Sequence, residues 1–252
     1  MIRRLWNRQQ VAMREAHVPD GMRIYAIGDL HGEAGLLLKM MRKISAELDD
    51  SDVSDIRVIF LGDLIDRGTN SRVLLESLSR LRHDNLILLK GNHEATLVDS
   101  YRGNESAFRF WLEYGGLSTL RSFGIEAADE VFPDPLRLRD EMHAHIDPAL
   151  IDWLDELPVS HIEGDYLFVH AGIKPGRELD EQTEEDILWM REPFLSSTVD
   201  HGKVVVHGHT VCENDVALGG NRIGIDTGAY EHGCLTALGL QGAHQWTISV
   251  RE

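Results

Sequence analysis

The segment MRIYAIGDLHG, at positions 22–32, runs from an apolar stretch straight into a polar loop that is bounded by glycines. We predict that its first six residues form a β-strand. The same pattern returns in IRVIFLGDLIDRG, at 56–68, and a third apolar run at 86–89 leads into KGNHE, at 90–94. Each of these three predicted strands is therefore followed at once by side chains that can bind a ligand.

Two series of apolar residues at helical spacing lie between these strands: Leu37, Met41, Ile44 and Leu48, and then Leu74, Leu78 and Leu81. Asn70 or Ser71 is expected to cap the second helix. The order strand–helix–strand–helix–strand predicts an α/β fold in which the early strands are parallel. Ligands of such sheets bind just beyond the carboxyl ends of the strands, which is where the polar segments lie.

The second half of the chain contains further predicted strands, at 166–169, 203–206, 222–225, 235–240 and 246–250. Two of them are followed by histidines, at His170 and at 207–209. Residues 100–157 are expected to be mostly helical and to form an insert against the core. We expect a polar N-terminal leader over 1–21, whose few apolar groups have no packing partner, and a single domain over 22–252.

The composition argues against several classes of protein. The 252 residues are 42% hydrophobic, and no apolar run approaches the ~18 residues that cross a membrane. The 25 Lys and Arg against 42 Asp and Glu give a net charge of −17, so stable binding to nucleic-acid phosphates is not expected. The cysteines are Cys212 and Cys234, which are not paired in a Cys-x-x-Cys motif. A disulfide framework is therefore not expected, and a cytoplasmic location is.

Six polar residues at the predicted strand ends carry oxygen or nitrogen donors: Asp29, His31, Asp63, Asn92, His170 and His209. Taken singly, each is more simply explained as a loop residue or a cap. Taken together, with glycines beside them, they predict a site for divalent metal ions such as Mn, Fe, Co, Ni or Zn. Six donors exceed what one open catalytic metal needs, so a carboxylate shared between two metals is the interpretation we favour.

These motifs, in this order, resemble the metallophosphoesterase superfamily. They are GDLHG at 28–32, GDLIDRG at 62–68, GNHE at 91–94, HAG at 170–172 and GHT at 208–210. The likeness covers about 22–250 and is strongest to the bacterial and phage branch of the PPP-type serine/threonine protein phosphatases. It implies an α/β fold with two β-sheets packed as a sandwich between helices (αββα), and a mostly helical insert.

The resemblance also implies a dinuclear metal centre. Asp29 and His31 would hold the first ion, and Asp63 would bridge both. Asn92, His170 and His209 would complete the second site. Manganese is the expected metal, with Fe, Zn, Co or Ni as alternatives. His207 is expected to point elsewhere.

By the same resemblance, a hydroxide that bridges the metals would attack a phosphate monoester in line. His93 would protonate the leaving oxygen, with Asp66 holding the imidazole in orientation. Arg67 and Arg191, together with Asn92, would bind the phosphate. For Asp226, support of the metal site and a turn cap are equally good interpretations.

Three functions are compatible with this set of residues. The first is dephosphorylation of phosphoserine or phosphothreonine in proteins, with a phosphoprotein or a small phosphoester as substrate. The second is hydrolysis of nucleotides by an enzyme of the diadenosine tetraphosphatase type. The third is a non-catalytic metal-binding module that has kept only the fold. The oligomeric state is not predictable from the sequence.

Overall fold

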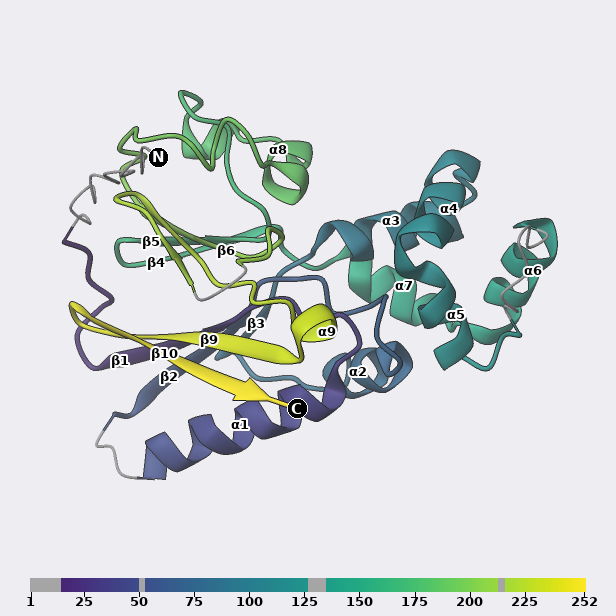
Figure 1. The fold of residues 1–252 in the computed structure, drawn as a ribbon, viewed down its shortest axis with the longest axis horizontal. Helices are drawn as coiled ribbons and strands as arrows, with labels where there is room; N and C mark the ends of the chain where they lie inside the picture. Colours follow the sequence, from purple (N-terminus) through teal and green to yellow (C-terminus); the bar gives the residue numbers. More distant parts are fainter. Residues whose placement is uncertain (1–14, 50–52, 127–134, 213–215) are drawn as a thin grey trace, which may run out of the picture.

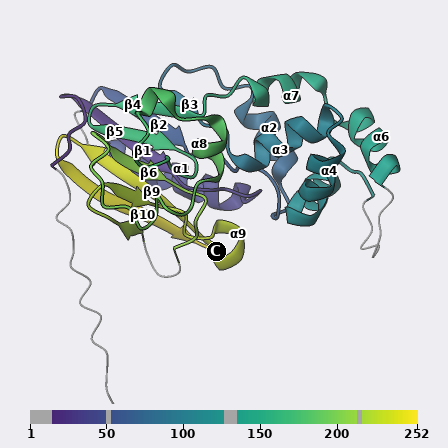
Figure 2. The same ribbon diagram turned by 90° about the horizontal axis from the view of Figure 1, so that it is seen from above.

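The computed structural model describes residues 15–49, 53–126, 135–212 and 216–252. The first fourteen residues of the expected leader lie outside the described residues. The described elements form two β-sheets that face each other, with helices outside them and a group of helices at one end (Figures 1 and 2). The expected two-sheet α/β sandwich between helices is therefore confirmed.

The first sheet has the strand order β10-β9-β1-β2-β3. Its strands are β1 (Met22–Ile27), β2 (Asp55–Phe60), β3 (Leu86–Leu88), β9 (Cys234–Gln241) and β10 (His244–Arg251). β1, β2 and β3 pair in parallel, as the sequence predicted, and Ile24 lies opposite Arg57 in the register of β1 and β2. β9 returns antiparallel to β1, so the C-terminal hairpin closes this side of the sheet.

The second sheet has the order β4-β5-β6-β8-β7. Its strands are β4 (Ser160–Glu163), β5 (Tyr166–Val169), β6 (Val204–His207), β7 (Ala217–Leu218) and β8 (Arg222–Gly224). β5, β6 and β8 are parallel and correspond to predicted strands. β4 and β7 were not predicted, because the first is polar at most positions and the second has only two residues, both exposed.

Alternation along β1 explains how the first sheet is covered on both faces. Ile24 and Ala26 pack into the cluster between the two sheets, which also contains Phe168 and Val206. Tyr25 and Ile27 point to the opposite face and join the cluster beneath the helices. Successive side chains of a strand point to opposite faces, so one strand contributes to both cores.

Helix α1 (Ala34–Asp49) packs on the outer face of the first sheet, near β9 and β10. It buries Leu36, Met40 and Ile44, whereas the periodicity predicted a face through Leu37 and Met41. Ile44 belongs to both faces, so the prediction was right there, and the observed face is turned from the predicted one toward Leu36 and Met40 by less than the ~100° between neighbouring residues. Leu37 still packs at the margin of the core, while 36% of Met41 is exposed.

The remaining helices of the described residues follow α1 in the chain. They are α2 (Ser71–Leu78), α3 (Asn92–Tyr101), α4 (Glu105–Trp111), a kinked segment (Leu112–Gly116), α5 (Leu117–Ser122), α6 (Pro135–His145), α7 (Pro148–Asp155), a short 3₁₀ helix (Leu179–Glu181), α8 (Glu184–Trp189) and α9 (Ala229–His232). α3 to α7 form the group at one end of the sheets, which we call the helical layer (Figure 1). This layer begins at Asn92, inside a motif that the sequence analysis treated as a loop. The predicted cap at Asn70 stands at the start of α2 but makes no side-chain cap bond.

The described end of the leader is part of the packed structure. Ala16 and Val18 are each only 3% exposed and belong to the cluster between the sheets. The main-chain N–H of Val18 donates to the carbonyl of Gly242 at 3.1 Å. The expectation that the leader's apolar groups have no partner is therefore wrong for these two residues. Among the described residues, none of the helices has the length and apolar character to cross a membrane.

Candidate metal centre

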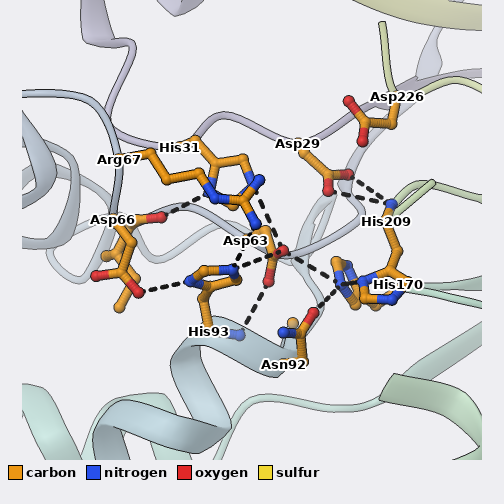
Figure 3. Close-up of polar contacts among 12 residues, drawn as sticks. Asp29, His31, Asp63, Asp66, Arg67, Asn92, His93, His170, His209 and Asp226 are labelled. Atoms are coloured by element: carbon orange, nitrogen blue, oxygen red, sulfur yellow. Dashed lines mark hydrogen bonds and ion pairs between the residues drawn. The ribbon is translucent and has the colours of Figure 1, made fainter. Parts of the chain in front are cut away.

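The predicted donors meet at one end of the sandwich because parallel strands deliver their carboxyl ends to the same edge. Asp29 and His31 follow β1, Asp63 follows β2 and Asn92 opens α3 just after β3. His170 and His209 follow β5 and β6 of the second sheet. Figure 3 shows the six side chains around one centre, although they come from positions almost two hundred residues apart.

Asp63 lies at the middle of this arrangement. Its carboxylate belongs to two groups of possible metal ligands, one with His31 and His93 and the other with His170 and His209. The ligand atoms within each group lie within 4.8 Å of one another. One oxygen, Oδ2, is 3.6 Å from Nε2 of His31 and 3.4 Å from Nε2 of His170. One carboxylate therefore stands where two ions could share it.

Asn92 and Asp29 lie beside the second of these groups. The Oδ1 atom of Asn92 is 2.8 Å from Nε2 of His170. The carboxylate of Asp29 accepts the main-chain N–H of His209, at 3.1 and 3.2 Å. Gly208 makes this approach possible, because a Cβ atom there would lie 2.0 Å from Oδ1 of Asp29. The sequence analysis paired Asp29 with His31; the structure brings His93 rather than Asp29 into the group of His31.

The imidazole rings are oriented by the main chain in the way that metal ligation requires. Nδ1–H of His31 donates to the carbonyl of Ile65, and Nδ1–H of His170 donates to the carbonyl of Leu61, each at 2.9 Å. A ring whose Nδ1 is occupied in this way directs Nε2 to the metal. Both Nε2 atoms point toward Asp63, so these residues fit a divalent ion.

The electrostatics of the centre also favour positive charge. Burial opposes ionisation of Asp63, but the imidazoles of His170 and His93 outweigh it and hold the carboxyl pKa well below its usual value. Burial also opposes a charge on His170, but the carboxylate of Asp63 raises its pKa to about 10. Burial lowers the pKa of His31 and of His209 to about 3. Protons on His170 thus supply some of the positive charge that bound cations would provide.

Backbone strain is concentrated at this site. In the described ranges, every non-glycine residue with a positive φ is one of the candidates: His31, Asp63, Asp66, Arg67 and His209. Left-handed backbone is unfavourable for residues that carry a Cβ, and it persists where the surroundings impose it, often at functional sites. The fold therefore holds these side chains in place at a cost in free energy.

A buried carboxylate that the sequence analysis passed over explains how the loop after β2 is held. Glu94 accepts the main-chain N–H groups of Gly91, Asp63 and Leu64, each at 2.8 Å. Burial is the main reason that its pKa is raised to about 7. Its place three residues after Gly91, in a capping box, is a signal that could have indicated this role.

The imidazole of His93, the predicted proton donor, is oriented by a hydrogen bond from Nδ1, the ring nitrogen that would not face the substrate. His93 Nδ1–H donates to Oδ2 of Asp66 at 2.6 Å. The same carboxylate accepts the indole Nε1–H of Trp111 at 2.8 Å and the hydroxyl of Thr119 at 2.5 Å. His93, Asp66, Trp111 and Thr119 are all buried. The sequence pattern placed Trp111 on an apolar helix face, and it did not predict that Trp111 or Thr119 would contact Asp66.

The two predicted phosphate-binding arginines differ in their surroundings. Arg67 Nη1 donates to Nε2 of His31 at 3.0 Å, Nη2 lies 3.2 Å from Nε2 of His93, and the guanidinium sits over the ring of Tyr230 at 4.9 Å. Arg191 is exposed at the rim, and its charge contributes to the lowered pKa of His209. The structure thus places Arg67 inside the site and Arg191 at its edge.

Two further residues lie near the centre but outside both donor groups. Asp226 accepts the main-chain N–H of Gly228 at 2.9 Å, and burial, followed by the charge of Asp63, raises its pKa to about 6. It therefore both caps a turn and faces the buried carboxylates. His207 is buried against Phe194, with ring centroids 5.2 Å apart, and belongs to neither donor group.

Comparison with known proteins decides the family. The model of the calcineurin-like phosphoesterases matches residues 22–225, which is most of the chain. The chain belongs to the calcineurin-like phosphoesterase family. It is therefore a metallophosphoesterase, a hydrolase of a family that uses divalent metal ions. Two clusters of ligand atoms around Asp63 accord with that chemistry.

Relatives within the calcineurin-like phosphoesterases have more than one activity. The chain is 34% identical over 158 residues to a symmetrical bis(5′-nucleosyl)-tetraphosphatase of Aromatoleum aromaticum, covering 62% of this chain and 46% of that one. It is 28% identical over 222 residues to serine/threonine-protein phosphatase 2 of Salmonella typhimurium, covering 84% and 90%. The chain thus spans about half the length of the tetraphosphatases it matches.

Solved structures of the same fold include a candidate diadenosine tetraphosphatase, with a TM-score of 0.61 at 20% identity over 93% of this chain and 98% of that one. A cold-active protein-tyrosine phosphatase of Shewanella aligns with a TM-score of 0.57 at 18% identity, covering 94% of this chain and 82% of that one. At such identities these likenesses establish the fold and leave the substrate open.

Proposed function

We propose that this calcineurin-like phosphoesterase removes the phosphate from phosphoserine or phosphothreonine in proteins. The observation that carries the proposal is the contact between His93 and Asp66, at 2.6 Å, beside the two donor groups. A serine or threonine alkoxide is a poor leaving group and needs a proton as it departs. A leaving nucleoside phosphate is stable as an anion and needs that proton far less.

Two divalent ions, preferably manganese, would occupy the centre. Asp29, His31 and Asp63 would hold the first, and Asp63, Asn92, His170 and His209 the second. Such ions, when bound, polarise the phosphoryl group and lower the pKa of coordinated water. His93 also lies in the first donor group, with its Nε2 3.9 Å from Oδ2 of Asp63, and we assign it to proton transfer rather than to metal binding.

The side chains of the protein would perform the remaining steps. Arg67 and Arg191 would bind the non-bridging phosphate oxygens through forked guanidinium groups, and the amide of Asn92 would add a further contact. These charges attract an anion locally on a protein whose net charge is −17. His93 would transfer its Nε2 proton to the departing oxygen, while Asp66 keeps Nδ1 occupied and the ring in place.

The extent of similarity supports the phosphatase over the tetraphosphatase. The Salmonella phosphatase matches along 84% of this chain and 90% of its own length, whereas the tetraphosphatase of Aromatoleum aromaticum matches over 46% of its own length. The higher identity to the tetraphosphatase, 34% against 28%, favours hydrolysis of diadenosine tetraphosphate as the second candidate. Cys212 and Cys234 are not joined to each other in a disulfide, in keeping with the cytoplasmic location that we propose.

A comparison of substrates at fixed manganese concentration tests the proposal. The purified protein is assayed with a phosphoserine peptide, with p-nitrophenyl phosphate and with diadenosine tetraphosphate, each with and without EDTA. We expect EDTA-sensitive hydrolysis and a higher kcat/KM for the phosphopeptide than for the dinucleotide. A clear preference for the dinucleotide would support the second candidate, and no EDTA-sensitive hydrolysis would support a non-catalytic binding module.

A further inference from the structure

Trp111, the last residue of α4, shares an acceptor atom with the proposed proton donor. Its indole Nε1–H donates to Oδ2 of Asp66 at 2.8 Å, and Nδ1–H of His93 donates to that same oxygen at 2.6 Å. Both side chains approach one atom from different elements, the indole from the end of α4 and the imidazole from the start of α3. The position of this oxygen therefore depends on the indole as well as on the imidazole.

The indole is itself fixed by its packing. Trp111 is 1% exposed, and its ring lies so close to Gly116 that a Cβ there would be 2.4 Å from the ring. Phe108 packs beside it, with ring centroids 6.1 Å apart. A side chain held so tightly can orient its partner, because buried rings in close-packed surroundings have few alternative positions.

Asp66 needs such support from outside its own loop. Its φ of 73° is left-handed, a conformation that an aspartate adopts at a cost. Thr119 holds the other carboxylate oxygen, Oδ1, through its hydroxyl, and also accepts the main-chain N–H of Asp66 at 3.0 Å. Residues of the helical layer thus donate hydrogen bonds to both carboxylate oxygens of Asp66. Asp66 itself lies in the loop that follows β2 of the first sheet.

We propose that Trp111 is a positioning residue, which acts through Asp66 to hold His93 where the leaving oxygen of the substrate will stand. This inference rests on the proposed function, because it assigns His93 the role of proton donor. Proton transfer requires the two heavy atoms to come within hydrogen-bond reach. Loss of the indole N–H leaves Oδ2 of Asp66 with one fewer partner, so the imidazole ring gains freedom to turn.

The experiment compares Trp111→Phe with the wild-type enzyme on two manganese-dependent reactions. A phosphoserine peptide has a leaving group that needs a proton, and p-nitrophenyl phosphate has one that does not. General acid catalysis contributes about 10²–10⁴-fold, so partial misplacement should lower kcat for the peptide by ~10-fold or more. The KM for the peptide and the kcat for p-nitrophenyl phosphate should change by less than ~3-fold, since phosphate binding is untouched.

Trp246→Phe is the matched control. Its indole Nε1–H also donates to a carboxylate, Oε2 of Glu47, at 3.1 Å, but it lies on β10, outside the site. This substitution should leave both reactions unchanged. Equal losses of Trp111→Phe on both substrates would mean that Trp111 only supports the fold, and the inference would be wrong.

A second replacement of Trp111 keeps the test decisive if phenylalanine disturbs folding. In 3-benzothienylalanine a sulfur atom replaces Nε1–H, so the ring keeps its shape and loses only the donor. Undiminished turnover of the phosphopeptide by this protein would overturn the inference. A loss confined to the phosphopeptide would support it.

A double-mutant cycle with Asp66→Asn tests the path of the effect. If Trp111 acts through Asp66, Trp111→Phe should cause less than a ~2-fold further loss once Asp66 has been replaced. Independent, multiplying losses would contradict that path. Failure of the proposed function is distinguishable, because the wild-type protein would then prefer the dinucleotide or show no metal-dependent hydrolysis.

Discussion

Asp63 combines an unfavourable backbone conformation, burial and a place in both groups of possible metal ligands. It has a positive φ, it is 2% exposed, and its carboxylate belongs to both groups of possible metal ligands. Gly91 permits this crowding, because a Cβ there would lie 2.2 Å from Oδ1 of Asp63. The arrangement indicates that its negative charge, and not only its shape, holds the centre together.

Asp63→Asn should therefore lower the metal content of the protein. The amide keeps the size of the side chain but removes the charge that two ions would share, so we expect a fall from about two manganese ions per chain to below about one. Elemental analysis after gel filtration measures this. Asp140→Asn, in α6 of the helical layer, is the control; an unchanged metal content in Asp63→Asn would contradict the bridging role.

His93 offers a different test at the same scale. His93→Ala should reduce kcat for a phosphoserine peptide by ~10²-fold or more, and kcat for p-nitrophenyl phosphate much less, because the aryl oxide leaves without a proton. His143 lies in the helical layer, where its Nε2 is 2.8 Å from the main-chain carbonyl of Tyr101, so His143→Ala should change neither rate. Equal losses on both substrates would exclude His93 as the proton donor.

The kinked segment of the helical layer, Leu112–Gly116, contacts the candidate site through its main chain. Gly115 has a φ of 126°, and its carbonyl accepts the main-chain N–H of Arg67 at 3.3 Å. Tyr114 and Gly115 have non-helical φ and ψ values, so the chain is kinked here between α4 and α5. Here it brings a carbonyl to the residue that we expect to bind phosphate.

Gly115→Ala should therefore weaken substrate binding. A Cβ at this position would lie 2.8 Å from Cγ of Arg67, which displaces the guanidinium, and we expect KM to rise by ~10-fold, the loss of about one good polar contact. Gly124→Ala is a matched control, because Gly124 also has a positive φ, 84°, but nothing lies within 4 Å of its added Cβ. It should lower thermal stability without changing KM. A normal KM in Gly115→Ala would refute this role of the kinked segment.

The sequence could predict the parts of the site that a local pattern marks, and it could not predict the parts that depend on distant contacts. The positions of the polar segments that follow β1, β2 and β3 were predictable, because a local apolar run and a glycine mark each strand end, although the segment after β3 begins α3. Trp111 and Thr119 were not, since their contacts with Asp66 span 45 and 53 residues along the chain and no local pattern encodes them. The burial of Ala16 and Val18 was missed for the same reason, as it depends on turns at Asp165 and Gly242.

At the scale of the whole molecule, the candidate centre joins the two sheets. Asp29, His31 and Asp63 follow strands of the first sheet, whereas His170 and His209 follow strands of the second. The donor group of Asp63, His170 and His209 therefore draws its possible ligands from both sheets. An ion bound to them would link the two halves of the sandwich in the folded state only.

Removal of metal should accordingly destabilise the protein. An ion at ~100 times its dissociation constant adds about 2.7 kcal/mol to the free energy of unfolding, so EDTA should lower Tm by about 5–10 °C for a chain of this size. Differential scanning calorimetry with and without manganese measures the shift. In Asp63→Asn, manganese should have little effect on Tm, and a full shift in that variant would show that the ion binds elsewhere.

The grip of the helical layer on Asp66 has a consequence for how this enzyme can change over evolutionary time. Trp111 and Thr119 belong to α4 and α5 of the helical layer, whereas the proposed metal ligands directly follow strands of the two sheets. Substitutions among those helices can retune turnover for substrates with poor leaving groups while the cations stay in place. New substrate preferences can therefore arise through changes in the helical layer, while the proposed metal ligands remain the same.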